Sequence, residues 1–137
     1  MAVQSKISEI ANHLEYLGYS VQTLEPKEPK SPKVYVATHA QKWNLLLWEA
    51  NPDLVMFHVT IQSSKKAAKG MDECVNLANQ KLLLAKAYHF PAGKTTALKL
   101  EAYYPGGYER RVFGAFLDAF LNDVREFSAL DTKKLFF

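Results

Sequence analysis

Residues 103–111, which read YYPGGYERR, come nearest to a binding motif in this sequence. Gly106 and Gly107 precede Arg110 and Arg111, and an apolar segment follows. Glycines before a helix that carries two arginines could hold an anion at the helix N-terminus. The spacing matches neither the Walker motif nor the dinucleotide-binding fingerprint. We interpret the segment as a tight turn from a strand into a helix, with Gly107 able to serve as N-cap. Contact with an anion or a partner is the alternative.

The histidines, the serines and the one cysteine form no pattern typical of catalysis or metal binding. No histidine stands within a few residues of another histidine or of a cysteine, as zinc sites require. Ser63 and Ser64 follow a strand-like run without the glycines of a nucleophile elbow. Cys74 lies on the apolar face of a predicted helix, where a buried inert thiol is usual. We therefore expect no enzyme activity, no metal and no cofactor.

Length and composition indicate one domain in a reducing compartment. The chain has 137 residues and a single cysteine, so no internal disulfide can form. No stretch approaches the ~18 to 20 apolar residues that span a bilayer, and the first residues lack the pattern of a secretory signal. These features predict a cytoplasmic protein without membrane contact.

The positive charge is small and comes mostly from lysine. The net charge is +3, and Arg110, Arg111 and Arg125 are the only arginines in the sequence. Proteins that read DNA bases or clamp phosphates usually rely on arginine. This composition argues against a nucleic-acid partner. A weak binding surface for anions or polyanions, formed by Lys65 and Lys66 with Arg110 and Arg111, remains an alternative. For the two lysines, we favour the interpretation that they belong to a solvated connector.

Hydrophobic periodicity predicts a helix, about four strands, a second helix, two strands and a third helix. The proline-rich connector EPKEPKSPK can join neither a helix nor a central strand. Most connections are too short for parallel crossovers, so we expect a mainly antiparallel sheet with packed helices, an α+β domain. The expected helices are residues 3–17, 65–83 and about 108–128; the expected strands are 19–24, 34–40, 43–50, 54–63, 83–90 and 95–104.

Two pairs of side chains need an account beside this pattern. Trp43 and Trp48 are separated by an odd number of residues in one predicted strand, so they should face opposite sides. At least one of the two tryptophans could contact a partner.

Asn76 and Asn79 lie near the end of the second helix, where we favour a cap that fixes the turn into the next strand. The apolar end of the chain, Leu135 to Phe137, should fold back onto the core or dock on a second copy.

Three segments together resemble the YbjN-domain family of bacterial proteins, often labelled as sensory-transduction regulators. They are LEYLGYSV at 14–21, CVNLANQKLLLAKAYHF at 74–90 and FGAFLDAFLNDVREF at 113–127. That family is similar in fold to the chaperones of type III secretion systems. The resemblance implies no catalytic residues and no cofactor. It also implies a homodimer that holds an extended segment of another protein, although those chaperones are typically acidic and this chain is mildly basic.

Two functions follow from the sequence. The first is a non-enzymatic, chaperone-like or regulatory protein-binding domain that uses an apolar sheet face. The second is a weak binder of anions or nucleic acid, whose affinity should fall steeply with added salt.

Overall fold

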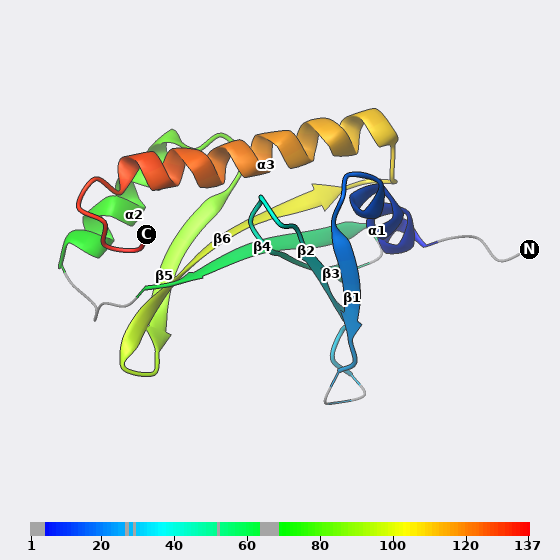
Figure 1. Cartoon of the computed structure of the whole chain (residues 1–137), viewed down its shortest axis with the longest axis horizontal. Helices are drawn as coiled ribbons and strands as arrows, with labels where there is room; N and C mark the ends of the chain where they lie inside the picture. Colours follow the sequence, from blue (N-terminus) through cyan, green and yellow to red (C-terminus); the bar gives the residue numbers. More distant parts are fainter. Residues whose placement is uncertain (1–4, 27, 29, 52, 64–68) are drawn as a thin grey trace, which may run out of the picture. The chain divides into compact units, whose positions relative to one another are not determined.

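The computed structural model describes residues 5–26, 28, 30–51, 53–63 and 69–137. The predicted contact residues Lys65 and Lys66 lie outside the described residues. The order of elements agrees with the order expected from the sequence (Figure 1). The elements are α1 Lys6–Tyr16, β1 Ser20–Leu24, β2 Val34–Thr38, β3 Leu45–Asn51, β4 Leu54–Gln62, α2 Lys69–Lys81, β5 Lys86–Ala92, β6 Thr95–Pro105 and α3 Arg110–Leu130.

The six strands form one antiparallel sheet in the order β1-β2-β3-β4-β6-β5. The predicted α+β class with a mainly antiparallel sheet is therefore confirmed. Strands β1 and β5 stand at the two ends of this order, so each leaves one side of its backbone outside the ladder.

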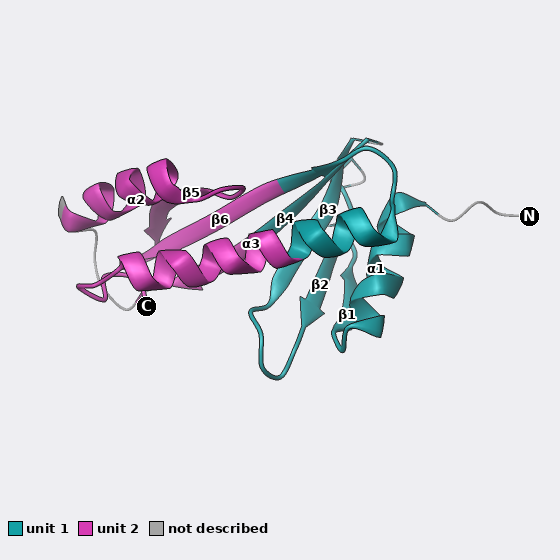
Figure 2. Ribbon diagram, turned by 90° about the horizontal axis from the view of Figure 1, so that it is seen from above, with its two compact units in different colours: residues 1–58, 103–117 teal, residues 59–102, 118–137 magenta. Residues whose placement is uncertain are grey.

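The chain divides into two compact units (Figure 2). Unit 1 comprises residues 1–58 and 103–117, and unit 2 comprises residues 59–102 and 118–137. Strands β4 and β6 and helix α3 contribute residues to both units. Each unit has its own buried apolar residues and is described separately below.

The core of unit 1 contains the contact between α3 and β4 together with buried residues of α1. Phe57 of β4 is fully buried, with its ring centroid 5.7 Å from that of Phe113 and 5.2 Å from that of Phe116 on α3. Ile10 and Leu14 of α1 are also fully buried. Helix α1 forms because these apolar residues recur at helical spacing and because the Ser5 hydroxyl caps its start by accepting the Ser8 N–H.

The core of unit 2 follows the same physical pattern. From Leu98 onward, strand β6 alternates buried with partly or fully exposed side chains, as a half-buried strand should. Helices α2 and α3 each turn an apolar stripe inward. The buried residues of this core include Met71, Val75, Ala78, Leu98, Leu100, Phe120, Val124 and Phe127.

The starts of β3 and β5 lie two and three residues later than the sequence predicted, and hydrogen bonds of the preceding residues account for both. Strand β3 begins at Leu45 instead of Trp43, because the preceding residues form a turn in which the His39 ring accepts the Gln41 N–H at 3.0 Å. Strand β5 begins at Lys86 instead of residue 83. The N–H groups of residues 83–85 are bonded to the side chain of Asp123, so they do not join the sheet.

Candidate partner-binding surface

The segment YYPGGYERR forms a turn held together by its own unit. Gly106 has φ +74°, which glycine adopts without strain, and its N–H donates to the Asp53 carbonyl at 3.0 Å. The Lys6 ammonium donates to the carbonyls of Tyr104 and Asp53, at 2.7 Å and 3.0 Å. The buried Tyr104 hydroxyl accepts the Glu109 N–H at 3.3 Å. The backbone groups of this segment therefore bond to the protein itself.

The N-cap of α3 is Glu109, and the expectation that Gly107 could serve in this role is wrong. A carboxylate oxygen of Glu109 accepts the Val112 N–H at 2.7 Å. A glycine has no side-chain acceptor to offer, whereas a carboxylate at this position also suits the positive end of the helix dipole. Gly107 lies outside the helix, with its carbonyl 3.5 Å from the Tyr104 hydroxyl.

Arg110 turns toward aromatic neighbours of its own unit. Its guanidinium lies 5.3 Å from the ring centroid of Tyr16, a cation–π contact. Nearby, His13 Nδ1 and the Tyr108 hydroxyl lie 2.8 Å apart. Burial and then the charge of Arg110 lower the pKa of His13 below its ordinary value. The lowered pKa favours the neutral imidazole, whose Nδ1 can accept a hydrogen bond from the Tyr108 hydroxyl.

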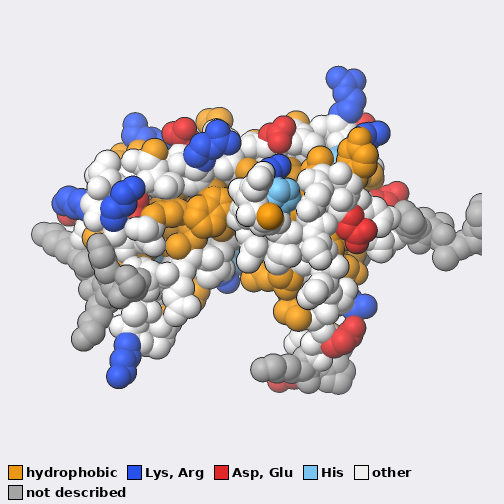
Figure 3. Space-filling model, viewed as in Figure 1, with side chains coloured by type: hydrophobic (Ala, Val, Ile, Leu, Met, Phe, Trp, Pro, Cys, Tyr) orange, Lys and Arg blue, Asp and Glu red, His pale blue; other side chains and the backbone are white. Residues whose placement is uncertain are grey.

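Arg111 is exposed and forms no ion pair with the residues that the structure describes. On the face of the molecule seen in Figure 3, lysine and arginine side chains stand singly, with aspartate and glutamate among them. A site for a polyanion needs several cations in one place. Of the four residues of the predicted anion site, the structure describes Arg110 and Arg111.

Unit 1 has a second sheet face on the side away from Phe57. The side chains of Leu45, Leu47 and Phe57 point to the first face and are fully buried. Residues one position along each strand point to the other face, because side chains alternate along a strand. Neither α1 nor the part of α3 in unit 1 lies over this second face (Figure 1).

The second face carries a row of apolar side chains across neighbouring strands. Val36 of β2 pairs with Leu46 of β3, and both are partly exposed. Leu24 at the end of β1 pairs with Val34 and is 53% exposed. Hydrophobic side chains reach the surface beside β1 in Figure 3. We define the open face as Leu24, Val34, Val36, Leu46 and Trp48.

The two tryptophans occupy different settings. Trp48 lies on the open face, partly exposed, with its ring centroid 4.4 Å from that of the buried His58 on β4. Trp43 is 40% exposed in the loop before β3. Because Trp43 lies outside the strand, alternation does not set its direction, and the expectation of opposite faces of one strand does not apply to it. Trp48 is the tryptophan that belongs to the open face.

Strand β1 borders the open face and is an edge of the sheet. Its residues, SVQTL, include neither a charge nor a proline, the devices that commonly protect an edge strand from pairing with another chain. Four of its five residues are exposed. An extended partner segment could therefore meet both free backbone groups along β1 and apolar side chains beside it.

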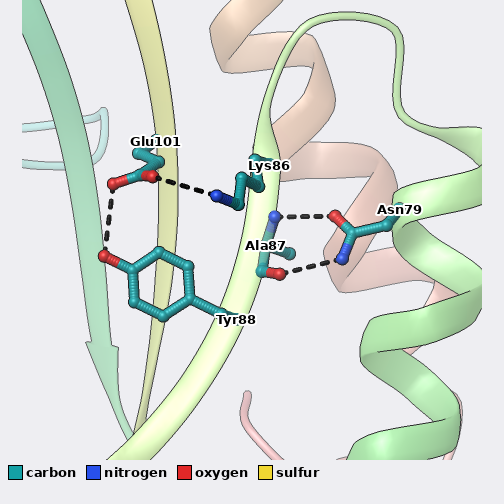
Figure 4. Close-up of polar contacts among 5 residues, drawn as sticks. All are labelled: Asn79, Lys86, Ala87, Tyr88 and Glu101. Carbon is teal, nitrogen blue, oxygen red and sulfur yellow. Dashed lines mark hydrogen bonds and ion pairs between the residues drawn. The ribbon is translucent and has the colours of Figure 1, made fainter.

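Asn79 in unit 2 acts on the backbone of the chain itself. Its amide nitrogen donates to the Ala87 carbonyl at 2.9 Å, and its amide oxygen accepts the Ala87 N–H at 2.8 Å (Figure 4). Glu101 on β6 accepts from the Tyr88 hydroxyl at 3.2 Å and lies 4.0 Å from the Lys86 ammonium. Asn76, one turn before Asn79, is exposed. Asn79 thus joins the end of α2 to β5.

Two aspartates outside the residues predicted to be functional are the most buried carboxylates in the described part of the chain. Asp123 and Asp131 are each 1% exposed. The Asp123 carboxylate accepts the N–H groups of residues 83–85 at 3.1, 2.7 and 2.7 Å. Asp131 accepts those of residues 135–137 at 2.8, 2.7 and 3.1 Å. Their position on the phenylalanine stripe of α3 was a sequence signal, since Phe116, Phe120, Asp123, Phe127 and Asp131 follow one another at spacings of three and four.

The part of the chain that the structure describes contains no group of three metal-binding side chains, and none of its helices is long and apolar enough to cross a membrane. Cys74 is partly exposed in unit 2. Burial, and secondarily the charge of Asp131, raise the pKa of its thiol. The thiolate, which is the reactive form, is therefore disfavoured.

The comparisons with known proteins identify the fold. No family model and no curated protein matches the sequence. Among solved structures, the chain is similar to YbjN from E. coli, described as a candidate transcription regulator, with a TM-score of 0.71 and 12% identity. The match covers 100% of this chain and 99% of that one. The chain therefore has a YbjN-like fold, as the sequence resemblance predicted, and at this identity the likeness concerns the fold alone.

Proposed function

We propose that this chain is a non-enzymatic protein-binding domain whose open face holds an extended segment of another protein. The observation that carries the proposal is the row of exposed and partly exposed apolar side chains from Leu24 to Trp48, bordered by the edge strand β1. Exposed apolar surface of this kind is typical of interaction sites. Uncharged strand edges favour pairing with a further strand.

The geometry of the open face defines the chemistry of a suitable partner. A segment that pairs with β1 would alternate its side chains, so that every second residue meets the apolar row. A large apolar residue opposite Leu24 would bury its exposed part, and a continuation of the segment across the open face would bury the partly exposed Val36 and Trp48 on the inner strands. We extend the proposal to a cytoplasmic, regulatory role and a homodimeric state, in line with the YbjN resemblance.

Capture of partners by matched variants tests the proposal. The tagged chain is recovered from its native host, and proteins that co-purify are quantified by mass spectrometry. Trp48→Ala should reduce a stoichiometric partner at least about tenfold, as expected for a buried aromatic anchor. Leu83→Ala is the matched control, because Leu83 is an apolar residue of unit 2 with 87% exposure. It should leave capture unchanged.

The thermal melting of each variant separates lost binding from lost folding. Trp43→Ala tests whether the exposed loop before β3 contributes to the same surface. Equal capture by wild type, Trp43→Ala and Trp48→Ala, with all three folded, contradicts the proposal. Co-purified nucleotide or RNA without a protein partner would instead support the anion-binding alternative through Arg110 and Arg111.

A further inference from the structure

The last residues of the described chain are bound in unit 2 by Asp131, which lies four to six residues before them, and by Ser63, which lies 72 residues away from Leu135 in the sequence. The Asp131 carboxylate accepts the N–H groups of Leu135, Phe136 and Phe137. The Ser63 hydroxyl, at the end of β4, donates to the Leu135 carbonyl at 2.7 Å. We call residues 135–137 the strap. Its backbone is hydrogen-bonded at four points, three of them to Asp131 and one to Ser63.

The side chains of the strap fill an apolar groove. Phe136 is 3% exposed, and its ring centroid lies 5.8 Å from that of Phe127 on α3 and 6.0 Å from that of His89 on β5. A methyl group added at Gly70 on α2 would come within 3.0 Å of the Leu135 side chain. The groove therefore has a floor from α3 and β5 and leaves room for Leu135 where α2 has a glycine.

The hinge before the strap is under backbone strain. Lys134 has φ +53° and is the only residue other than glycine with a positive φ in the described part of the chain. A side chain with a Cβ atom disfavours this conformation. The turn is closed by the Thr132 N–H, which donates to Leu130, and by the Lys134 N–H, which donates to Asp131. Docking of the strap in its own chain requires this strained turn.

We propose that the strap exchanges between two copies of this chain, each strap occupying the groove of the other. A second copy is the occupant that the groove fits, because its contacts with this sequence are already present within one chain. Exchange reproduces the contacts of the strap and lets residues 132–134 straighten. It gives up the two hydrogen bonds that close the turn and relieves the strain at Lys134 twice per dimer. Short strained hinges favour this kind of exchange.

Exchange depends on protein concentration. Within one chain the strap has an effective concentration of roughly millimolar, so the closed monomer prevails in dilute solution. The dimer gains from strain relief and should appear as the concentration rises. This inference concerns unit 2 and does not rest on the proposed partner surface of unit 1. A dimer would nevertheless present two open faces, and so would raise the avidity for a partner with two segments.

Disulfide trapping distinguishes docking within a chain from exchange. The variant Gly70→Cys with Leu135→Cys places two thiols across the groove, and Cys74→Ser removes the native thiol that also lines this region. The smaller side chain at 135 relieves the crowding at 70. After oxidation, non-reducing electrophoresis separates chains linked internally from covalent dimers. The variant with Leu135→Cys and Cys74→Ser alone measures random pairing.

We expect internal links at micromolar concentration and covalent dimers, above the background of the single-cysteine variant, near millimolar concentration. Light scattering of the unmodified chain should show a dimer over the same range. Lys134→Gly relieves the strain in the closed form and should weaken dimerisation by about tenfold or more. Only internal links at every concentration, no links at all, or a dimer insensitive to Lys134→Gly would each overturn the proposal.

Discussion

The two units differ in their buried carboxylates and in their apolar sheet surface. In unit 2, two buried carboxylates, Asp123 on α3 and Asp131 directly after it, bind the backbone of a loop and of the strap, so the polar groups of these segments are satisfied within the chain. In unit 1, an apolar sheet face and an uncharged edge strand are left partly exposed. Directional bonds fix connections in both units, and unit 1 in addition keeps an apolar sheet face that a partner could bury.

The strongest test of this contrast is Asp123→Ala. Three N–H groups would lose a charged acceptor, and the Ala85 N–H would be left in a buried position. Hydrogen bonds to charged groups contribute roughly 1.5 to 3 kcal/mol each and do not add fully. We expect a loss of about 3 to 4 kcal/mol in the free energy of unfolding, measured by urea denaturation. Asp118→Asn, at an exposed position of the same helix, should change it by less than about 0.5 kcal/mol.

Asp131→Asn should have a smaller effect than the loss of Asp123. The carboxamide keeps one acceptor oxygen for the N–H groups of residues 135–137. We expect a loss of about 2 kcal/mol. Hydrogen exchange should become faster at residues 135–137, while residues 83–85 keep their protection. Equal acceleration in both segments would mean that the two carboxylates do not act separately.

Asn79→Ala comes next in size. It removes two hydrogen bonds to Ala87 and should cost about 1 to 2 kcal/mol. Asn76→Ala is the matched control on the same helix, because Asn76 is exposed like Asn79 but forms no hydrogen bond with the residues that the structure describes. It should leave stability unchanged or raise it slightly, since alanine is the better helix former. Similar losses in both variants would contradict a specific role for Asn79.

The sequence predicted the elements better than their connections. Apolar periodicity was enough to place three helices and six strands, because burial of one face dominates the energetics of each element. It could not show that Asp123 takes the N–H groups of residues 83–85, since these residues are about forty positions apart in the chain. The start of β5 depends on that distant contact.

The candidate surface was predictable only in part. Trp48 was singled out from its residue type, but the open face consists mainly of Val36, Leu46 and Leu24, which look like ordinary strand residues. Packing between distant elements decides which face of a sheet the helices cover. Neither face of these strands carries enough polar residues for the sequence to indicate which face is covered. The cation–π contact of Arg110 could not be predicted either, because its partner Tyr16 lies on α1, far from Arg110 in the sequence.

The smallest expected effect lies in unit 1 and concerns pH. Because the native pKa of His13 is lowered, first by burial and then by Arg110, the unfolded chain binds the proton more readily. Native stability from this residue is therefore fully present above the ordinary pKa of 6.5 and decreases as the pH falls below it, until the native pKa is passed.

As the pH falls from neutral to 5, the free energy of unfolding should therefore decrease less in His13→Gln than in the wild type. Urea denaturation of both proteins at each pH measures this difference. In Arg110→Gln the pKa of His13, followed by NMR, should rise only part of the way, because burial is the larger cause. A complete return to the ordinary value would make the charge of Arg110 the main cause. It would also mean that charge controls the contacts at the start of α3, as the buried carboxylates control the connections of unit 2. The two units would then differ only in the open face.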